Sequence, residues 1–203
     1  MTDSTLGAEW DERYASWADQ IPDDSPSAVM VEVAGSLTPG TALDVGCGIG
    51  ANAIWLAAHG WDTTALDVSQ VALDRATARG RHAGVDVRWL RGRLEDLAVA
   101  PSDFVVAHYP ALRHSPGNDA ERSLLAAVAP GGTLLVVHHA NVELELAKAH
   151  GFDPSDYVSH DDVVGALGDE WDVAVEGRRP RDMPAGLDGQ HTHDDVIVAR
   201  RRR

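Results

Sequence analysis

The sequence predicts an α/β fold in which a mostly parallel sheet carries helices on both faces. Apolar runs of strand length alternate with helix-like segments along most of the chain, and this alternation is typical of sheets built from strand–helix–strand units. A glycine-rich turn joins the first strand to the next helix at residues 46–51, the connection that holds nucleotides in such sheets. Two late strand-like segments, 170–178 and 194–201, have no helix-length segment between them. One of these two strands is therefore expected to run antiparallel.

The size of the chain fits one domain built around one core. It has 203 residues, which is within the range of single domains. We expect residues 1–39 to form a helical N-terminal cap and residues 40–203 to form the nucleotide-binding domain. The single cysteine, Cys47, excludes an internal disulfide and a cysteine-built zinc site.

Composition limits the classes of partner that we expect. The chain has no run of about 18 apolar residues, so no membrane span is expected. Residues 1–20 are acidic and polar, unlike a secretory signal, and we expect a cytoplasmic protein. The formal net charge of −15 would repel a phosphate backbone, which disfavours nucleic acid as a substrate. The basic end, Arg200–Arg203, is interpreted as a solvated terminus rather than a contact for nucleic acid or anionic lipid.

An aromatic helix is predicted near the start of the sequence. Residues 9–19 place Trp10, Tyr14 and Trp17 at helical spacing, so this helix has one aromatic face. The face has two interpretations of similar weight. It is either a stripe buried against the core or a lid that folds over a cationic ligand and excludes water. In the second interpretation Tyr14 is the expected contact.

The other elements follow from periodicity and from start and stop residues. Residues 25–37 are predicted to form a helix that begins after Ser25. Ser69 is expected to cap the helix after the second strand, and Ser159 is expected to form a capping box with Asp162. In chain order, the remaining elements are a strand at 41–45, a helix at 52–60, a strand at 62–68, a helix at 69–84, strands at 85–92 and 102–109, a helix at 121–132 stopped by Pro130 and Gly131, a strand at 133–139, a helix at 158–168, and the two late strands.

The glycine-rich turn matches a nucleotide-binding pattern. Gly46, Gly48 and Ala51 satisfy G-x-G-x-x-G/A, and Asp67 ends the second strand about 20 residues further on, where an acid can bind two ribose hydroxyls. Glycine is needed because the turn is tight and its backbone N–H groups approach the ligand closely. The spacing favours nucleotide binding over a turn with only a structural role.

The sequence around the turn does not have the features of a nicotinamide-binding site. Asp44 precedes the glycines, which continue to Gly50, and an acid at that place would repel a pyrophosphate. The chain is also too short to add a separate substrate domain. Two alternatives stay open: a nicotinamide-dependent reductase of reduced size, and a non-catalytic module that only binds the cofactor.

Three segments together resemble the class I S-adenosylmethionine-dependent methyltransferases: "LDVGCGIG", "ALDVS" and "VAPGGTLLVV". The resemblance covers roughly residues 40–140. It implies a three-layer Rossmann-like fold whose seven-stranded sheet has the order 3-2-1-4-5-7-6, with the last strand antiparallel. Within that family, "WDERY", "GANAIWLAAHGW" and "LLVVHH" are similar to small bacterial methyltransferases of the tellurite-resistance type and their uncharacterised relatives, although "HYPALRHSP" departs from that subgroup.

The resemblance implies S-adenosylmethionine as the cofactor and S-adenosylhomocysteine as its product. Asp44 and the glycines match the motif that holds the methionine part, and Asp67 matches the acid that binds both ribose hydroxyls. Arg93 stands where the family often has an acid, so Glu95 or the backbone near Leu94 is expected to meet the adenine amine. The expected cofactor contacts are Tyr14, Asp44, Gly46, Cys47, Gly48, Gly50, Asn52, Asp67, Val68 beside the adenine, Arg93, Leu94, Glu95, His108 and Tyr109.

Several histidines are candidates for chemistry with the methyl acceptor. A thiolate or reduced chalcogen needs no strong base for methyl transfer, whereas a hydroxyl or ammonium group must lose a proton. His108, His114, His138 and His139 lie at the ends of the fourth and fifth predicted strands, the edge where ligands bind in open α/β sheets. We predict His114 and His139 as a base or a substrate clamp. His138 and His139 must face opposite ways, because side chains alternate along a strand.

Other polar residues are expected to be structural. His191 and His193 would share a face of a strand and could hold a metal beside an acid, but surface histidines are commoner, and no metal is expected. Arg178, Arg179 and Arg181 could bind an oxyanion or simply form a solvated strand end.

The remaining expectations concern the turn cysteine and the binding partners. Cys47 is interpreted as a small packing residue of the turn. The expected partner is a small-molecule methyl acceptor, with no nucleic acid and no membrane. The expected assembly is a monomer or a homodimer.

Overall fold

The computed structural model describes residues 3–17, 25–142, 144–149, 152–180 and 192–203. Its strands are β1 (Thr41–Val45), β2 (Asp62–Asp67), β3 (Arg88–Arg91), β4 (Ser102–His108), β5 (Val128–His139), β6 (Trp171–Pro180) and β7 (His193–Arg201). They form one sheet in the order β3-β2-β1-β4-β5-β7-β6, in which β7 runs antiparallel to both of its neighbours and the other pairs are parallel. The predicted fold class, strand order and antiparallel last strand are confirmed.

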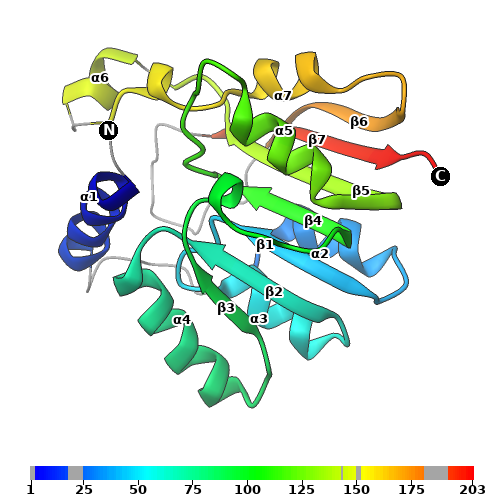
Figure 1. The fold of residues 1–203 in the computed structure, drawn as a ribbon, viewed down its shortest axis with the longest axis horizontal. Helices are drawn as coiled ribbons and strands as arrows, with labels where there is room; N and C mark the ends of the chain where they lie inside the picture. Colours follow the sequence, from blue (N-terminus) through cyan, green and yellow to red (C-terminus); the bar gives the residue numbers. More distant parts are fainter. Residues whose placement is uncertain (1–2, 18–24, 143, 150–151, 181–191) are drawn as a thin grey trace.

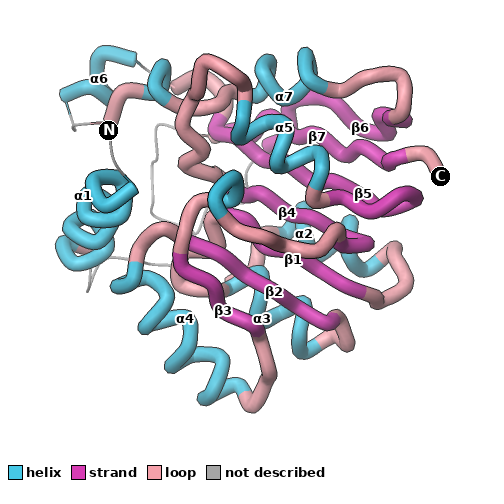
Figure 2. Tube along the Cα trace, viewed as in Figure 1, coloured by secondary structure: helices cyan, strands magenta, loops and turns pink. Residues whose placement is uncertain are grey.

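Helices cover both faces of this sheet (Figures 1 and 2). They are α1 (Asp3–Ser16), α2 (Ala28–Gly35), α3 (Ala51–Ala58), α4 (Gln70–Ala83), α5 (Asp119–Ala126), α6 (Leu144–Ala149) and α7 (His160–Ala166), with short 3₁₀ turns η1 (Leu94–Asp96) and η2 (Pro154–Asp156). Alternate side chains of β4 enter two separate cores. Val105 and Ala107 pack with buried residues of α5 and α7, whereas Phe104 and Val106 pack with those of α2 and α3.

The prediction that Pro130 and Gly131 stop a helix is wrong. The helix α5 already ends at Ala126, and β5 starts at Val128 and contains both residues. Gly131 has a φ of 84°, and the pairing of β4 with β5 shifts register between Ser102 and Phe104. The segment is therefore a bulge in the strand, where glycine supplies a backbone conformation that other residues rarely adopt.

Several helix starts agree with the predicted capping residues. The Ser69 side chain accepts a hydrogen bond from the Ala72 N–H at 3.1 Å, and Ser159 forms the expected capping box with Asp162. The second helix begins later than predicted, since its cap is Ser27 rather than Ser25. The helix α1 extends from Asp3 to Ser16, so it starts before the predicted range. The short helix α6 and both 3₁₀ turns were not predicted.

The basic end of the chain is bound to the sheet instead of being freely solvated. Arg201 Nη1 donates to the Val128 carbonyl at 2.8 Å, and Arg200 Nε donates to the Gly131 carbonyl at 3.3 Å. Arg202 pairs with Asp172. These side chains hold the starts of β5 and β6. No helix in the described part of the chain combines the length and apolar character required to span a bilayer.

Candidate functional site

A cavity lies at the carboxyl ends of β1, β2 and β4. It is open to solvent, and the empty space inside it, solvent at its mouth included, is about 530 Å³. The helices that follow β1 and β4 cover opposite faces of the sheet, which makes this edge the switch point where open α/β sheets bind ligands. Figure 1 shows α1 beside the same edge. The predicted site residues that line the cavity are Tyr14, Gly46, Asp67, Val68, Arg93, Leu94, Glu95 and Tyr109.

The three glycines of the turn after β1 are all in the left-handed backbone region. Their φ angles are 70° at Gly46, 54° at Gly48 and 84° at Gly50. A Cβ at Gly50 would come within 2.7 Å of the Trp89 ring, whereas a Cβ at Gly48 would come within 2.6 Å of the Tyr14 hydroxyl. Packing against Trp89 behind the turn therefore requires glycine at position 50. At position 48, the lack of a side chain leaves room for the Tyr14 hydroxyl on the open face of the turn.

Asp67, at the end of β2, is a buried carboxylate held by backbone donors. Its Oδ2 accepts the Gly48 N–H and its Oδ1 accepts the Ser69 N–H, both at 2.8 Å. Burial raises the pKa of this carboxyl, and these hydrogen bonds counteract the shift. The residue lines the cavity, so the turn after β1 and the cap of α4 fix its orientation toward a ligand.

Asp44, in β1, is a buried acid with an unsatisfied oxygen. It is 1% exposed, and its Oδ2 has no hydrogen-bond partner among the described residues. Burial, together with the nearby charge of Asp67, raises the pKa of Asp44 to about 7, although the Ala53 N–H opposes the shift. Asp44 does not line the cavity itself. A buried carboxylate in this state gains stability from a cationic partner.

Tyr14 covers the glycine turn from α1. Burial raises the pKa of its hydroxyl, and the charges of Asp67, Cys47 and Asp44 raise it further. Its ring contacts Trp10, whose indole also lines the cavity. The predicted aromatic face of α1 is therefore turned toward the site over much of its length, while Trp17 is 38% exposed.

Polar contacts at two points attach α1 to the rim of the cavity. Asp11 Oδ1 accepts the Ser69 hydroxyl at 2.6 Å and the Val71 N–H at 3.0 Å, so it adds a second cap to α4. Glu9 pairs with Arg113 at 2.8 Å, in the segment after β4. The helix thus bridges the two sides of the cavity.

The segment after β3 forms the wall on the side of β2 and β3. Arg93 Nε donates to Glu95 Oε1 at 2.8 Å, and the Glu95 side chain is 9% exposed. Leu94 is 2% exposed and packs in the core beneath. Arg93, which replaces the acid expected at its position, is therefore an ion-pair partner that fixes Glu95 in the wall.

A cluster of rings lies at the carboxyl ends of β4 and β5. The Tyr109 hydroxyl donates to Asp194 Oδ1 at 2.7 Å, and the Tyr109 ring stacks on His139 with centroids 3.6 Å apart. His139 Nδ1 lies 3.8 Å from Asp194 Oδ1. His108, whose ring is 4.0 Å from that of Tyr109, completes the cluster but does not line the cavity.

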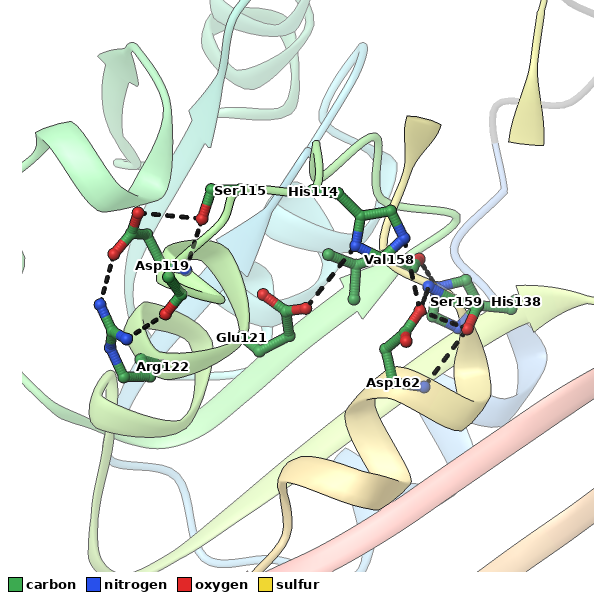
Figure 3. Close-up of polar contacts among 10 residues, drawn as sticks. His114, Ser115, Asp119, Glu121, Arg122, His138, Val158, Ser159 and Asp162 are labelled. Carbon is green, nitrogen blue, oxygen red and sulfur yellow. Dashed lines mark hydrogen bonds and ion pairs between the residues drawn. The ribbon is translucent and has the colours of Figure 1, made fainter. Parts of the chain in front are cut away.

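His114 lies apart from this cluster, in a polar contact network between the segment after β4, α5 and α7 (Figure 3). Its Nδ1 is 3.8 Å from Glu121 Oε1, and its Nε2 is 3.6 Å from Asp162 Oδ2. The residue is not among those that line the cavity. Its position fits a connection between two helices more closely than a contact with a ligand.

His138 and His139 face opposite ways, as strand alternation requires. His138 Nε2 is 3.1 Å from the Val158 carbonyl on the α7 side. Burial lowers the pKa of His138 to about 4, with a further contribution from His160. The imidazole of His138 is therefore neutral near pH 7 and belongs to the core rather than to the cavity.

The other predicted polar residues have structural partners. Arg178 pairs with Asp195 and Arg179 pairs with Glu32. Asn52, an expected cofactor contact, accepts the Ser27 N–H at 2.9 Å and holds the start of α2 instead of lining the cavity.

The turn cysteine, Cys47, is half-buried, and the loop before β7 is only partly described. Burial raises the pKa of Cys47, which agrees with a packing role. His193 begins β7, next to Thr192. His191 and Arg181 lie outside the described residues.

Sequence reasoning missed three contributors to the site. Asp11 lies on the predicted aromatic helix next to Trp10, so that helix could have indicated it. The lining segment Pro110–Arg113 directly follows a strand at the ligand edge, and that position is itself a signal. Asp194 meets Tyr109 across 85 positions of sequence, and no local pattern shows such a contact.

Comparison with known proteins finds methyltransferases among the relatives of this chain. Residues 42–132 match a family model described as a methyltransferase domain. Two curated relatives are the ribosomal RNA small subunit methyltransferase C of Alcanivorax borkumensis, 36% identical over 52% of this chain and 34% of its own length, and the ubiquinone biosynthesis O-methyltransferase of Bordetella avium, 36% identical over 50% of this chain and 43% of its own length. The chain thus spans less than half the length of either relative.

Solved structures share the fold over nearly the whole chain. A structure from a study of thioacetal formation in echinomycin biosynthesis aligns with a TM-score of 0.74 at 20% identity, over 97% of this chain and 92% of that one. Magnesium protoporphyrin IX methyltransferase of Synechocystis PCC 6803 with bound SAH aligns at 0.71 and 18% identity, over 98% and 99%. TehB of Haemophilus influenzae aligns at 0.69 and 16% identity, over 92% and 66%. At these identities the likeness shows the fold.

Proposed function

We propose that this chain, whose residues 42–132 match a methyltransferase domain, is a class I S-adenosylmethionine-dependent methyltransferase that binds S-adenosylmethionine and transfers its methyl group to a small-molecule acceptor. The single observation that carries the proposal is Asp44, a buried acid with an unsatisfied oxygen behind a turn of three left-handed glycines. When bound, the sulfonium supplies an activated methyl group, and S-adenosylhomocysteine remains as product.

The residues behind the glycine turn fit the methionine part of the cofactor. The ammonium group of the cofactor would give the buried Asp44 carboxylate a cationic partner. Charge-assisted hydrogen bonds of this kind are stronger than those between neutral groups. Gly48 would admit the ligand because it has no side chain. Tyr14 would have to leave or rotate from the face of Gly48, since its hydroxyl stands over that position.

The wall of β2 and β3 fits the nucleoside part. Asp67 is oriented by two N–H donors and would accept from the ribose hydroxyls. Val68, Arg93, Leu94 and Glu95 line the same side of the cavity and would surround the adenine. Further proposed contacts, carried over from the resemblance, are Gly46, Cys47, Gly50 and Tyr109. Asn52 and His108 remain predictions without support from their positions, because neither lines the cavity.

The acceptor side is proposed at the carboxyl ends of β4 and β5. His139 fits a base or a clamp there, since it stacks on a residue that lines the cavity. His114 remains a prediction, without support from its position. The proposed partner is a small molecule rather than nucleic acid or membrane. The protein is proposed to be cytoplasmic and to be a monomer or a homodimer. Residues 1–39 are proposed as the cap of a single domain that continues through 40–203.

Calorimetric titration of the full chain with S-adenosylhomocysteine tests the proposal, with NADH as the parallel ligand. We expect one-to-one binding at micromolar concentration for S-adenosylhomocysteine and no heat from NADH. Binding of NADH alone would overturn the proposal, because the turn would then hold a dinucleotide.

A further inference from the structure

A carboxylate from the last strand joins the two aromatic residues at the acceptor side. In the antiparallel pairing of β5 with β7, His139 lies directly opposite Asp194. Asp194 Oδ1 accepts the Tyr109 hydroxyl at 2.7 Å and lies 3.8 Å from His139 Nδ1. Because the Tyr109 ring both lines the cavity and stacks on His139, the three side chains form a continuous contact chain from the cavity wall to β7.

The backbone holds Tyr109 in an unusual conformation. Its φ is 52°, in the left-handed region that a bulky side chain rarely adopts. Its N–H donates to the Val137 carbonyl at 2.9 Å, and its hydroxyl is fixed by Asp194. Such conformations persist only where the surrounding structure imposes them, and they concentrate at functional sites.

We propose that Asp194 is a positioning residue that orients His139 as the base for the methyl acceptor, and that the acceptor is a protic nucleophile, a hydroxyl or an amine. The inference rests on the proposed methyltransferase function and specifies its substrate class. A base oriented by a third group is the usual arrangement for activating a weak nucleophile. A thiolate or a chalcogen oxyanion needs no base, and the carboxylate of Asp194 would repel it.

The step balances in protons and electrons. The acceptor O–H or N–H bond breaks, and its proton passes to the imidazole of His139. The acceptor lone pair forms the new bond to the methyl carbon, while the carbon–sulfur bond breaks and leaves its electron pair on sulfur. The His139 side chain is 31% exposed, so the imidazolium, stabilised by Asp194, can return its proton to water.

The charged and titratable neighbours of His139 come from three elements. Asp194 lies on β7, Tyr109 follows β4, and His138 precedes it on β5. Asp195 is the matched control for Asp194, because it is the next residue on β7 and pairs with Arg178 on β6 instead. Asp194→Asn keeps an oxygen that can accept the Tyr109 hydroxyl but removes the charge beside His139.

The test compares wild type, Asp194→Asn and Asp195→Asn in the full chain. Affinity for S-adenosylhomocysteine is measured first by calorimetry, and we expect all three proteins to agree. Transfer from methyl-labelled S-adenosylmethionine is then measured between pH 6 and 9 with catechol, an aliphatic diol, a primary amine, 2-mercaptoethanol and tellurite. We expect label in at least one hydroxyl or amine probe. With that probe, Asp194→Asn should lower kcat at least about tenfold, because positioned bases contribute about 10²–10⁴-fold.

The split between kinetic constants separates positioning from folding. We expect the acceptor KM of Asp194→Asn to change less than about threefold, since the loss falls on the transition state. The pH at which the rate rises should change in Asp194→Asn and stay the same in Asp195→Asn. Asp194→Glu should recover part of kcat. Label only in 2-mercaptoethanol or tellurite, no label in any probe, or equal rates for Asp194→Asn and Asp195→Asn would overturn the inference. Absence of S-adenosylhomocysteine binding in wild type would instead refute the proposed function.

Discussion

The two sides of the cavity are built in different ways. On the side of β1 and β2, backbone N–H groups and left-handed glycines orient two buried acids, Asp44 and Asp67, which lie within one strand–helix–strand unit. On the side of β4 and β5, side chains bind each other, and one of them comes from β7 near the end of the sequence. A site made from backbone geometry leaves a local motif in the sequence, whereas a site made from distant side chains leaves none.

The largest expected effect is on the side of β1 and β2. Asp44→Asn should weaken binding of S-adenosylhomocysteine by about 2–5 kcal/mol, the cost of removing one partner of a buried charge pair. In wild type the affinity should rise with pH up to about 7, because burial raises the pKa of Asp44 to about 7 and a cationic ligand favours its ionised form. Calorimetry in buffers of different ionisation enthalpy would detect the proton released below pH 7. The same affinity in Asp44→Asn would contradict the assignment.

Two buried groups, His138 behind β5 and Asp44 in β1, should make stability depend on pH with opposite sign. Burial lowers the pKa of His138 to about 4, so its stabilising contribution is complete above the unfolded value of about 6.5 and is lost as pH falls toward 4, up to about 3 kcal/mol. The raised pKa of Asp44 acts the other way: its contribution is complete below about pH 4 and is lost as pH rises to about 7. Urea unfolding at several pH values measures both.

Two variants separate these contributions. His138→Gln should reduce the loss of stability below pH 6.5, and Asp44→Asn should make the ligand-free protein more stable than wild type at pH 8. The second gain should disappear near pH 4, where Asp44 is protonated in both states. If the free energy of unfolding of wild type and of a variant changes with pH in parallel, the substituted group does not titrate as described.

An intermediate effect is expected at the ribose position. Asp67→Ala should weaken binding of S-adenosylhomocysteine by about 1–3 kcal/mol, the range for lost charge-assisted hydrogen bonds. Asp62→Ala is a matched control, because this acid begins the same strand at its exposed end. Calorimetry that finds no difference between the two variants would remove Asp67 from the ribose site.

The smallest effect concerns the helix that bridges the two sides. Arg113→Ala removes the pair with Glu9, and we expect a loss of only about 0.2–1 kcal/mol in the docking of α1, as for other partly exposed pairs. Tryptophan fluorescence during denaturant titration, to which Trp10 and Trp17 contribute two of six tryptophans, would report this loss. A change of several kcal/mol would mean that Arg113 also supports the core.

The difference between the two sides explains what the sequence could and could not predict. The glycines and Asp67 are predictable because spacing along one strand–turn–helix fixes their geometry. The helix stop predicted at Pro130 and Gly131 is wrong because the same residue pair breaks helices and forms strand bulges, and only the neighbouring strand decides between these outcomes. The partnership of Asp194 with Tyr109 depends on the position of β7, which tertiary packing determines.

Strand β7 holds β5 at both ends, through Asp194 beside His139 and through Arg201 at the Val128 carbonyl. Fluctuations that detach β7 would therefore free one edge of β5, which stays paired with β4, and would remove Asp194 from the acceptor wall. The glycine turn pairs with β2 instead, through the Leu66 carbonyl, and would keep its shape. In hydrogen exchange, the molecule would then behave as two cooperative units. Loss of the acceptor wall by local opening would leave the cofactor side folded.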